Sequence, residues 1–123
     1  MLVVKTKLRK SKIHGLGLFA DQNIKKGTPI WEYSPIIDKK ITKKQFNSLP
    51  KLVKKYMLEY VYLEEGKWIL CGDDGRFVNH SKHPNCDDEG DKTIAMRDIK
   101  KGEELTSNYF VFDASLKNQK SIK

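Results

Sequence analysis

Two glycines separated by one leucine are the first residues whose types and spacing could serve binding chemistry. Residues 15–20, GLGLFA, match the GxGxxG/A fingerprint that holds a dinucleotide pyrophosphate, and Asp38 follows at about the distance of a ribose-binding acid. That fingerprint must open a crossover helix of about a dozen residues. Asn23, Gly27 and Pro29 interrupt the chain too early for such a helix, so a nucleotide-binding unit is disfavoured. A tight turn between two strands explains the glycines without any ligand.

Residues 76–86 form a second group of side chains with chemical potential. The amide of Asn79 supplies both donors and an acceptor, and His80 taken alone could be a metal ligand or a general base. A single histidine without spaced Cys, His or carboxylate partners makes a poor metal site, and no nucleophile with an adjacent base is evident. We therefore expect no metal, and contact with a bound ligand is the preferred interpretation.

Three segments, in this order, resemble the SET domain family: residues 15–20, RFVNHSKHPNC at 76–86, and GEELTSNY at 102–109. The resemblance spans residues 12–109 and depends chiefly on the nearly complete middle motif. Residues 30–33, IWEY, are similar to the family's EY strand, although Ser34 and Pro35 replace its usual glycine-acid continuation. The resemblance implies a protein-lysine N-methyltransferase that takes its methyl group from S-adenosylmethionine. It also implies a protein substrate that carries an accessible lysine.

The same resemblance implies roles for individual residues. Tyr109 is implied to stand between the transferable methyl and the incoming amine, as the catalytic residue. The cofactor-binding residues implied are Gly15, Leu16, Gly17, Asn79, His80 and Tyr109. The residues implied to line the lysine channel are Tyr33, Tyr60, Tyr62, Phe110 and Phe112. An ordinary place in the core stays open for Tyr109, and amphipathic positions already explain Tyr60 and Tyr62.

Short strands and two short helices must position these residues. Strands are expected over 3–9, 18–20 and 30–33. Thr42 and Gln45 have the spacing of a capping box, which predicts a helix over 42–49 that ends near Pro50. A second helix should follow, with one apolar stripe packed against the core. That stripe comprises Leu52, Val53, Tyr56, Met57 and Tyr60.

The second half of the chain is again predicted to be β-rich. Residues 60–63 and 68–70 flank a glycine-containing turn, which is typical of a hairpin, and strands are expected over 93–97 and 104–109. Residues 79–90 hold too many polar and turn residues for a regular element. The predicted fold class is therefore mostly β with short central helices. The resemblance implies a SET-domain β-clip of small twisted sheets with a knot-like C-terminal threading.

Length and composition predict one domain. The resemblance implies that it is a SET domain over residues 1–112, with a C-terminal tail at 113–123. No stretch is apolar enough to span a membrane, so we expect no membrane association. Cys71 and Cys86 fit two buried free thiols better than a disulfide framework. We expect a cytoplasmic location, or a nuclear one if the source is eukaryotic or viral, and a homodimer is compatible with the sequence.

The charge balance leaves a second class of function open. The chain has 24 basic and 16 acidic residues, for a net charge of +8, which favours weak association with nucleic acid. The alternative is therefore a non-catalytic SET scaffold that uses its lysines to bind nucleic acid. Although the net charge of the chain is positive, a run of acidic residues follows the motif at 76–86. It comprises Asp87, Asp88, Glu89 and Asp91. It either attracts a lysine-rich substrate or is a solvated turn.

Overall fold

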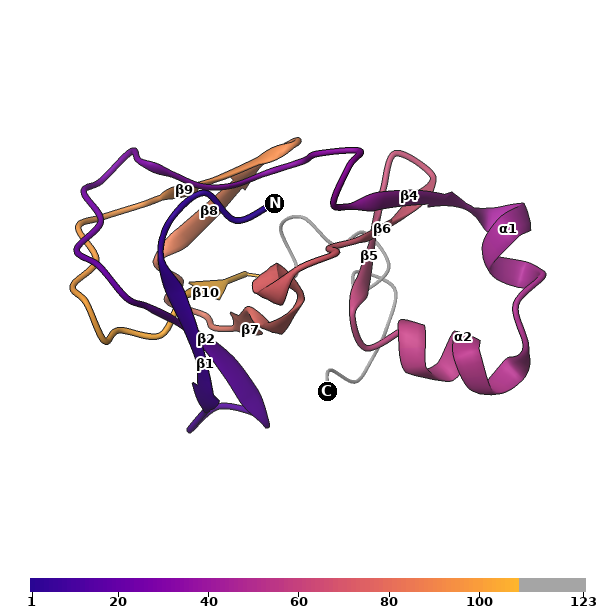
Figure 1. Cartoon of the computed structure of the whole chain (residues 1–123), viewed down its shortest axis with the longest axis horizontal. Coiled ribbons are helices and arrows are strands. Elements are labelled where there is room, and N and C mark those ends of the chain that lie inside the picture. The colour runs from indigo at the N-terminus through magenta and orange to yellow at the C-terminus, as the bar shows by residue number, and fades with distance from the viewer. Residues whose placement is uncertain (109–123) are drawn as a thin grey trace.

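The fold was analysed in a computed structural model, which describes residues 1–108. These residues form small sheets joined by short helices (Figure 1), so the predicted mostly-β class is confirmed. In chain order the elements are β1 (Thr6–Lys10), β2 (Leu16–Ala20), β3 (Pro29–Glu32), β4 (Lys39–Thr42), α1 (Lys43–Asn47), α2 (Lys51–Met57), β5 (Val61–Glu64), β6 (Lys67–Leu70), a 3₁₀ turn η1 (Asp74–Phe77), β7 (Asn79–His80), β8 (Cys86–Glu89), β9 (Lys92–Ala95) and β10 (Thr106–Ser107). The predictions for Tyr109, Phe110, Phe112 and the 113–123 tail lie outside the described residues.

The glycine segment lies at a hairpin, as the turn interpretation predicted. β1 and β2 pair antiparallel, with Thr6 opposite Ala20 and Lys10 opposite Leu16. Gly15 stands at the start of β2 with a positive φ of 45°, a conformation that favours glycine. The first strand begins at Thr6 instead of Val3. No crossover helix follows β2, because the chain continues through a turn into β3.

The main core lies between β2, β3 and β9 and the turn before β10. Leu18, Ile30, Ile99 and Leu105 are fully buried there, and Ala95 and Cys86 pack with them. β9 is the central strand of the sheet β3-β9-β8.

The prediction that residues 79–90 hold no regular element is wrong, because β7 and β8 fall within them. β8 pairs with the neighbouring β9 across a short turn, and only β7 depends on a distant partner, β10, which a local count of turn residues cannot detect.

The first helix forms as its capping box predicts. The Thr42 side chain accepts the Gln45 backbone N–H at 3.1 Å, and the Gln45 side chain accepts the Thr42 N–H at 2.9 Å. Phe46 is buried on this helix, with its ring 5.1 Å from that of Trp68 on β6. The predicted hairpin is also confirmed as β5 and β6, with Glu64 opposite Lys67.

The prediction that the second helix packs its apolar stripe on the core is wrong. α2 ends at Met57, and none of its residues is buried. Leu52 is 80% exposed and Tyr56 is 55% exposed. Both helices lie at one end of the molecule, beyond β4, β5 and β6 (Figure 1), so the strands of the core do not reach the stripe.

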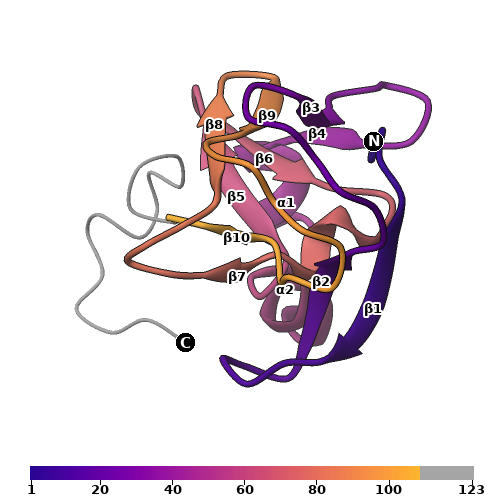
Figure 2. The same cartoon turned by 90° about the vertical axis from the view of Figure 1, so that its left-hand side faces the viewer.

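Residues 102–107 run between two segments that are far apart in the sequence. On one side, the Leu105 N–H donates to the Leu18 carbonyl at 2.8 Å, and the Ala20 N–H donates to the Glu103 carbonyl at 2.9 Å. On the other side, β10 pairs in parallel with β7, with Thr106 opposite Asn79 (Figure 2). This passage is the described part of the C-terminal threading, and any continuation at 109–112 lies outside the described residues.

A buried asparagine holds this passage in place. The Asn85 side chain donates to the Glu104 carbonyl at 2.8 Å and accepts the Thr106 N–H at 2.9 Å. Asn85 is 2% exposed, so these hydrogen bonds replace water for backbone groups that would otherwise be unsatisfied. Within residues 1–108, no helix is long and apolar enough to cross a membrane.

Both cysteines are free and buried, as predicted. Burial raises the pKa of each thiol to about 12, with Asp38 adding to the effect at Cys71 and Asp88 at Cys86. A thiol that keeps its proton in the folded state stabilises the fold below its unfolded pKa. That contribution is lost as the pH rises from the unfolded value near 9.0 through the folded one near 12.

We expect both thiols to be inert to a thiol reagent at pH 8 in the native protein and to react after unfolding in guanidinium. The urea midpoint should fall as the pH is raised above the unfolded thiol pKa. A variant with Cys71→Ala and Cys86→Ala is the control and should show a shallower fall. Rapid labelling of the native protein would contradict the burial of these side chains.

Candidate functional site

An open pocket of about 210 Å³ lies where the β1–β2 turn meets β7. Its lining comes from four segments: the β1–β2 turn, the end of the α2–β5 connection, η1 and β7. The lining residues are Ile13, His14, Gly15, Leu16, Glu59, Tyr60, Arg76, Phe77, Asn79 and His80. The structure therefore brings together four of the residues that the sequence assigned to a cofactor: Gly15, Leu16, Asn79 and His80.

Asn79 joins the two motifs directly. It is 7% exposed, and its Nδ2 donates to the carbonyls of His14 at 3.0 Å and Leu16 at 3.2 Å. The same Nδ2 donates to Oε2 of Glu104 at 2.9 Å. All hydrogen bonds of this side chain within residues 1–108 involve Nδ2, which leaves Oδ1 to accept a bond from a ligand.

Ser11 and Glu104 complete this network, and sequence reasoning assigned neither of them a role. The Ser11 hydroxyl contacts both carboxylate oxygens of Glu104, at 2.8 and 2.9 Å, and accepts the Ile13 N–H at 2.9 Å. Glu104 thus fixes the turn through Ser11 and orients Asn79 at the same time. Its place in the GEELTSNY segment was the available signal, but the sequence did not reveal which side chains it meets.

Gly17 lies behind the pocket wall and is not part of its lining. A β-carbon at this position would collide with the carboxylate of Glu104 and touch Ser11. The glycine is therefore required for close packing of the Glu104 side chain against β2. Its contribution to the site is indirect, through the carboxylate that it accommodates.

Aromatic rings form one wall of the pocket. The ring of Tyr60 lies 5.6 Å from that of Phe77, in an edge-on arrangement, and 5.1 Å from that of Tyr56. The guanidinium of Arg76 lies 5.9 Å from the Tyr60 ring centre. Tyr60 was predicted to line the lysine channel, and the structure places it in the same pocket as Asn79 and His80.

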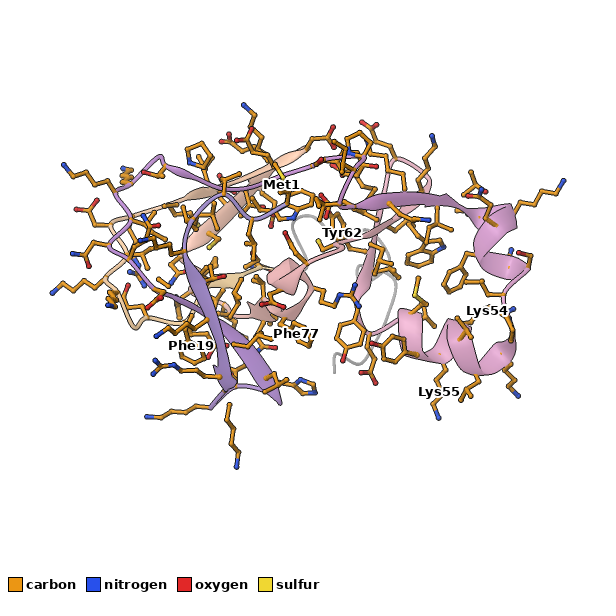
Figure 3. All side chains as sticks on the ribbon, in the orientation of Figure 1. Met1, Phe19, Lys54, Lys55, Tyr62 and Phe77 are labelled. Carbon is orange, nitrogen blue, oxygen red and sulfur yellow. The ribbon has the colours of Figure 1, made fainter. Side chains whose placement is uncertain are left out.

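Tyr33 and Tyr62, also predicted for the lysine channel, lie in a second cluster around Trp31, Ile69 and Cys71. Figure 3 shows Phe77 next to β7 and Tyr62 on β5, and the pocket lining found among residues 1–108 includes neither Tyr33 nor Tyr62. Burial, followed by the charges of neighbouring acidic groups, raises the pKa of Tyr62 far above its usual value. The shift shows that this hydroxyl lies in a desolvated environment next to negative charge.

Acidic side chains lie beside this second cluster. Burial raises the pKa of Glu64, and Asp91 and Glu65 add to the effect. Lys40 lies 3.5 Å from Asp91 and 4.5 Å from the Tyr33 ring centre. Within residues 1–108, no group of three or more His, Cys, Asp or Glu side chains is arranged to hold a metal ion.

The family profile of the SET domain matches residues 15–110. The chain is 36% identical over 110 residues to human histone-lysine N-methyltransferase 2B, covering 81% of this chain and 4% of that protein. It is 35% identical over 111 residues to the Schizosaccharomyces pombe histone-lysine N-methyltransferase specific for H3 lysine 36, covering 79% of this chain and 14% of that protein. The chain belongs to the SET domain family, although it spans only a small part of these relatives.

Solved structures agree with this family. The Chaetomium thermophilum Polycomb Repressive Complex 2, in an autoinhibited conformation bound to S-adenosylmethionine, aligns with a TM-score of 0.71 and 26% identity. The alignment covers 93% of this chain and 16% of that chain. The same complex bound to the inhibitor GSK126 aligns with a TM-score of 0.72. These comparisons confirm the predicted SET-domain fold.

We expect Glu104→Ala to loosen the β1–β2 turn, because it removes the carboxylate that both Ser11 and Asn79 contact. The free energy of unfolding should fall by about 1–3 kcal/mol, and the amides of Ile13 and His14 should exchange faster with deuterium. Glu103→Ala is the matched control, since that side chain meets Arg97 at the surface. The role assigned to Glu104 is wrong if both variants leave the exchange of the turn unchanged.

Proposed function

We propose that this chain transfers a methyl group from S-adenosylmethionine to the side-chain amine of a lysine in another protein. The observation that carries the proposal is the pocket in which the β1–β2 turn and the Asn79–His80 strand meet. Membership of the SET domain family and similarity to a structure bound to S-adenosylmethionine support it. The relatives are named as histone-lysine methyltransferases, so a histone is the first substrate class to test.

The residues of the pocket fit such a cofactor. Gly15 lets a ligand approach the backbone closely, and Oδ1 of Asn79 can accept a bond from an ammonium group. The faces of Tyr60 and Phe77 offer an apolar surface on which a purine ring can pack. His80 follows Asn79 on β7 and would hold the adenine end, while Leu16 completes the wall and Gly17 makes room for the Glu104 carboxylate behind it.

When bound, S-adenosylmethionine supplies a sulfonium methyl that bonds to the amine nitrogen as the carbon–sulfur bond breaks. The chain must align the amine with that bond, and orientation of this kind can supply much of the rate enhancement. A free lysine, with a pKa of about 10.4, is neutral in only about 1 in 2,500 molecules at pH 7. Apolar aromatic walls favour the neutral amine, and its proton can leave to water.

We assign these walls to the aromatic residues of the predicted channel. Tyr33 and Tyr62 offer ring faces in the cluster around Trp31, Ile69 and Cys71. Tyr109 is proposed as the catalytic residue at the methyl, with Phe110 and Phe112 closing the channel. The Tyr109 assignment rests on the family motif, whereas Phe110 and Phe112 follow that motif and would close the channel in place of the cysteine-rich segments of larger members, unless a partner does so.

The acidic run is proposed to attract basic substrates, and its members have different roles. Asp88 lies on β8 and accepts the Thr93 hydroxyl at 2.6 Å, so it holds the hairpin together. Glu89 and Asp91 are exposed near the β8–β9 turn, and Asp87 is half-buried. These three provide a negative rim on a chain with a net charge of +8.

A non-catalytic scaffold that binds nucleic acid through its lysines is the second candidate, and the net charge favours it. Calorimetric titration with S-adenosylmethionine separates the two functions, because a nucleic-acid module does not need this ligand. A histone substrate would place the protein in the nucleus, whereas another lysine-bearing protein would be consistent with the cytoplasm.

Two variants test the methyl transfer by separate steps. Asn79→Ala should weaken S-adenosylmethionine binding roughly tenfold or more, because a buried polar anchor is lost. Tyr109→Phe should keep cofactor affinity while it lowers turnover or changes the number of methyl groups added. Calorimetry measures the first effect, and mass spectrometry of methylated histone peptides measures the second. Wild-type values for both variants would refute the residue assignments, and failure of the unaltered protein to bind the cofactor would refute the function.

The triple change Asp87→Asn, Glu89→Gln and Asp91→Asn tests the acidic rim, with Asp88 kept for stability. The Michaelis constant for a lysine-rich peptide should rise several-fold at low salt, and its salt dependence should flatten. A peptide whose target lysine is flanked by uncharged residues is the control and should be unaffected. Unchanged kinetics with the basic peptide would mean that the substrate is recognised elsewhere.

A further inference from the structure

The apolar face of α2 has no covering partner within the described residues. Leu52 is 80% exposed, Val53 39% and Tyr56 55%, and Leu58 just beyond the helix is 49% exposed. Single exposed apolar residues are ordinary, but these four lie within seven consecutive positions of one short helix and its end. By helical spacing, Leu52, Val53 and Tyr56 share one face, and an exposed apolar face is typical of an interaction surface.

The helix also lacks the internal stabilisation that would explain its presence. It has seven residues, is preceded by Pro50 without a side-chain cap, and buries no side chain. A helix of this length is marginal in water unless one face packs on something. It contacts the described body through the ring of Tyr56, which meets that of Tyr60, and through Lys54 Nζ, which donates to the Asn47 carbonyl at 3.4 Å. Among the described residues, nothing buries Leu52 or Val53.

The charges around this face select the kind of molecule. Between positions 39 and 58 the sequence has seven lysines and no acidic residue: Lys39, Lys40, Lys43, Lys44, Lys51, Lys54 and Lys55. Lys51 and Lys55 are exposed on α2 itself, and Figure 3 shows Lys55 pointing away from the body of the molecule. Within residues 1–108, neither makes a salt bridge. The charged residues from position 39 to 58 are therefore all positive, and Glu59, next to Leu58, is the nearest acidic residue that follows.

We propose that α2 docks an acidic amphipathic helix of a partner protein. Its apolar side would cover Leu52, Val53 and Tyr56, and its carboxylates would meet Lys51 and Lys55. A nucleic acid could satisfy the lysines but would leave the aliphatic side chains exposed. A second copy of this chain would bring its own lysines against these and be repelled. Because Glu59 and Tyr60 directly follow Leu58 and line the pocket, the partner would lie beside the candidate site.

Fluorescence anisotropy with a labelled synthetic helix tests the proposal on the full chain without any assay of activity. The probe has leucines at i, i+3, i+4 and i+7 and glutamates at most other positions, and its control has the same composition with the leucines scrambled. Leu52→Ser with Val53→Ser should weaken binding of the probe roughly tenfold or more. Lys51→Ala with Lys55→Ala should weaken it a few-fold, and this loss should shrink at high salt.

Matched control variants come from elsewhere on the surface. Ile36→Ser changes another exposed aliphatic side chain, 89% exposed, and Lys5→Ala with Lys12→Ala removes two charges near the β1–β2 hairpin. Both should leave binding unchanged, while the scrambled peptide should bind weakly.

Three outcomes would overturn the proposal. The first is equal binding of both peptides, and the second is wild-type affinity in the Leu52 and Val53 variant. The third is a different occupant of α2. That would be duplex DNA whose binding depends on Lys51 and Lys55 but not on Leu52, or a dimer in sedimentation that Leu52→Ser and Val53→Ser dissociate. Because none of these measurements needs S-adenosylmethionine, the docking surface and the methyl transfer can fail independently.

Discussion

Backbone pairing of residues 102–107 with two separate segments is the constraint on which the rest of this structure depends. Leu105 is fully buried, and its N–H bonds to Leu18 in the first hairpin. Two residues later, Ser107 pairs with His80 in a parallel bridge. One short segment therefore brings two motifs that are more than sixty residues apart against each other. Among the described residues, β10 is the strand that pairs with β7, so β7 depends on this passage for its backbone partner.

The same passage explains why polar residues are buried beside the candidate site. A strand of two residues cannot satisfy its own backbone, so the Asn85 side chain bonds the Glu104 carbonyl and the Thr106 N–H. Glu104 then turns its carboxylate to Ser11 and Asn79. The space for that carboxylate exists because position 17 is glycine. The stability of this region and the geometry of the proposed ligand pocket thus depend on one connected set of hydrogen bonds. Each residue in it restricts the side-chain positions that its neighbours can adopt.

The arrangement also separates two chemical environments. The pocket at the β1–β2 turn combines backbone polar groups, an amide and aromatic rings. The cluster around Trp31 and Tyr62 is apolar with acidic groups at its edge, and burial there favours neutral forms of ionisable side chains. The first environment offers polar groups to a ligand, whereas in the second the acidic groups at the edge favour a positively charged partner.

The sequence alone determined the local features and the family. The Thr42 capping box, the β5–β6 hairpin and the glycine turn each depend on residues within a few positions of one another, and the three motifs indicated the SET domain fold. The sequence did not determine that no side chain of α2 is buried, that residues 79–80 form a strand, or that Glu104 contacts Ser11 and Asn79. Only the tertiary structure decided these, because each depends on which distant parts of the chain lie nearby. An apolar stripe predicts that a face can be buried, but what lies opposite it is set by the fold.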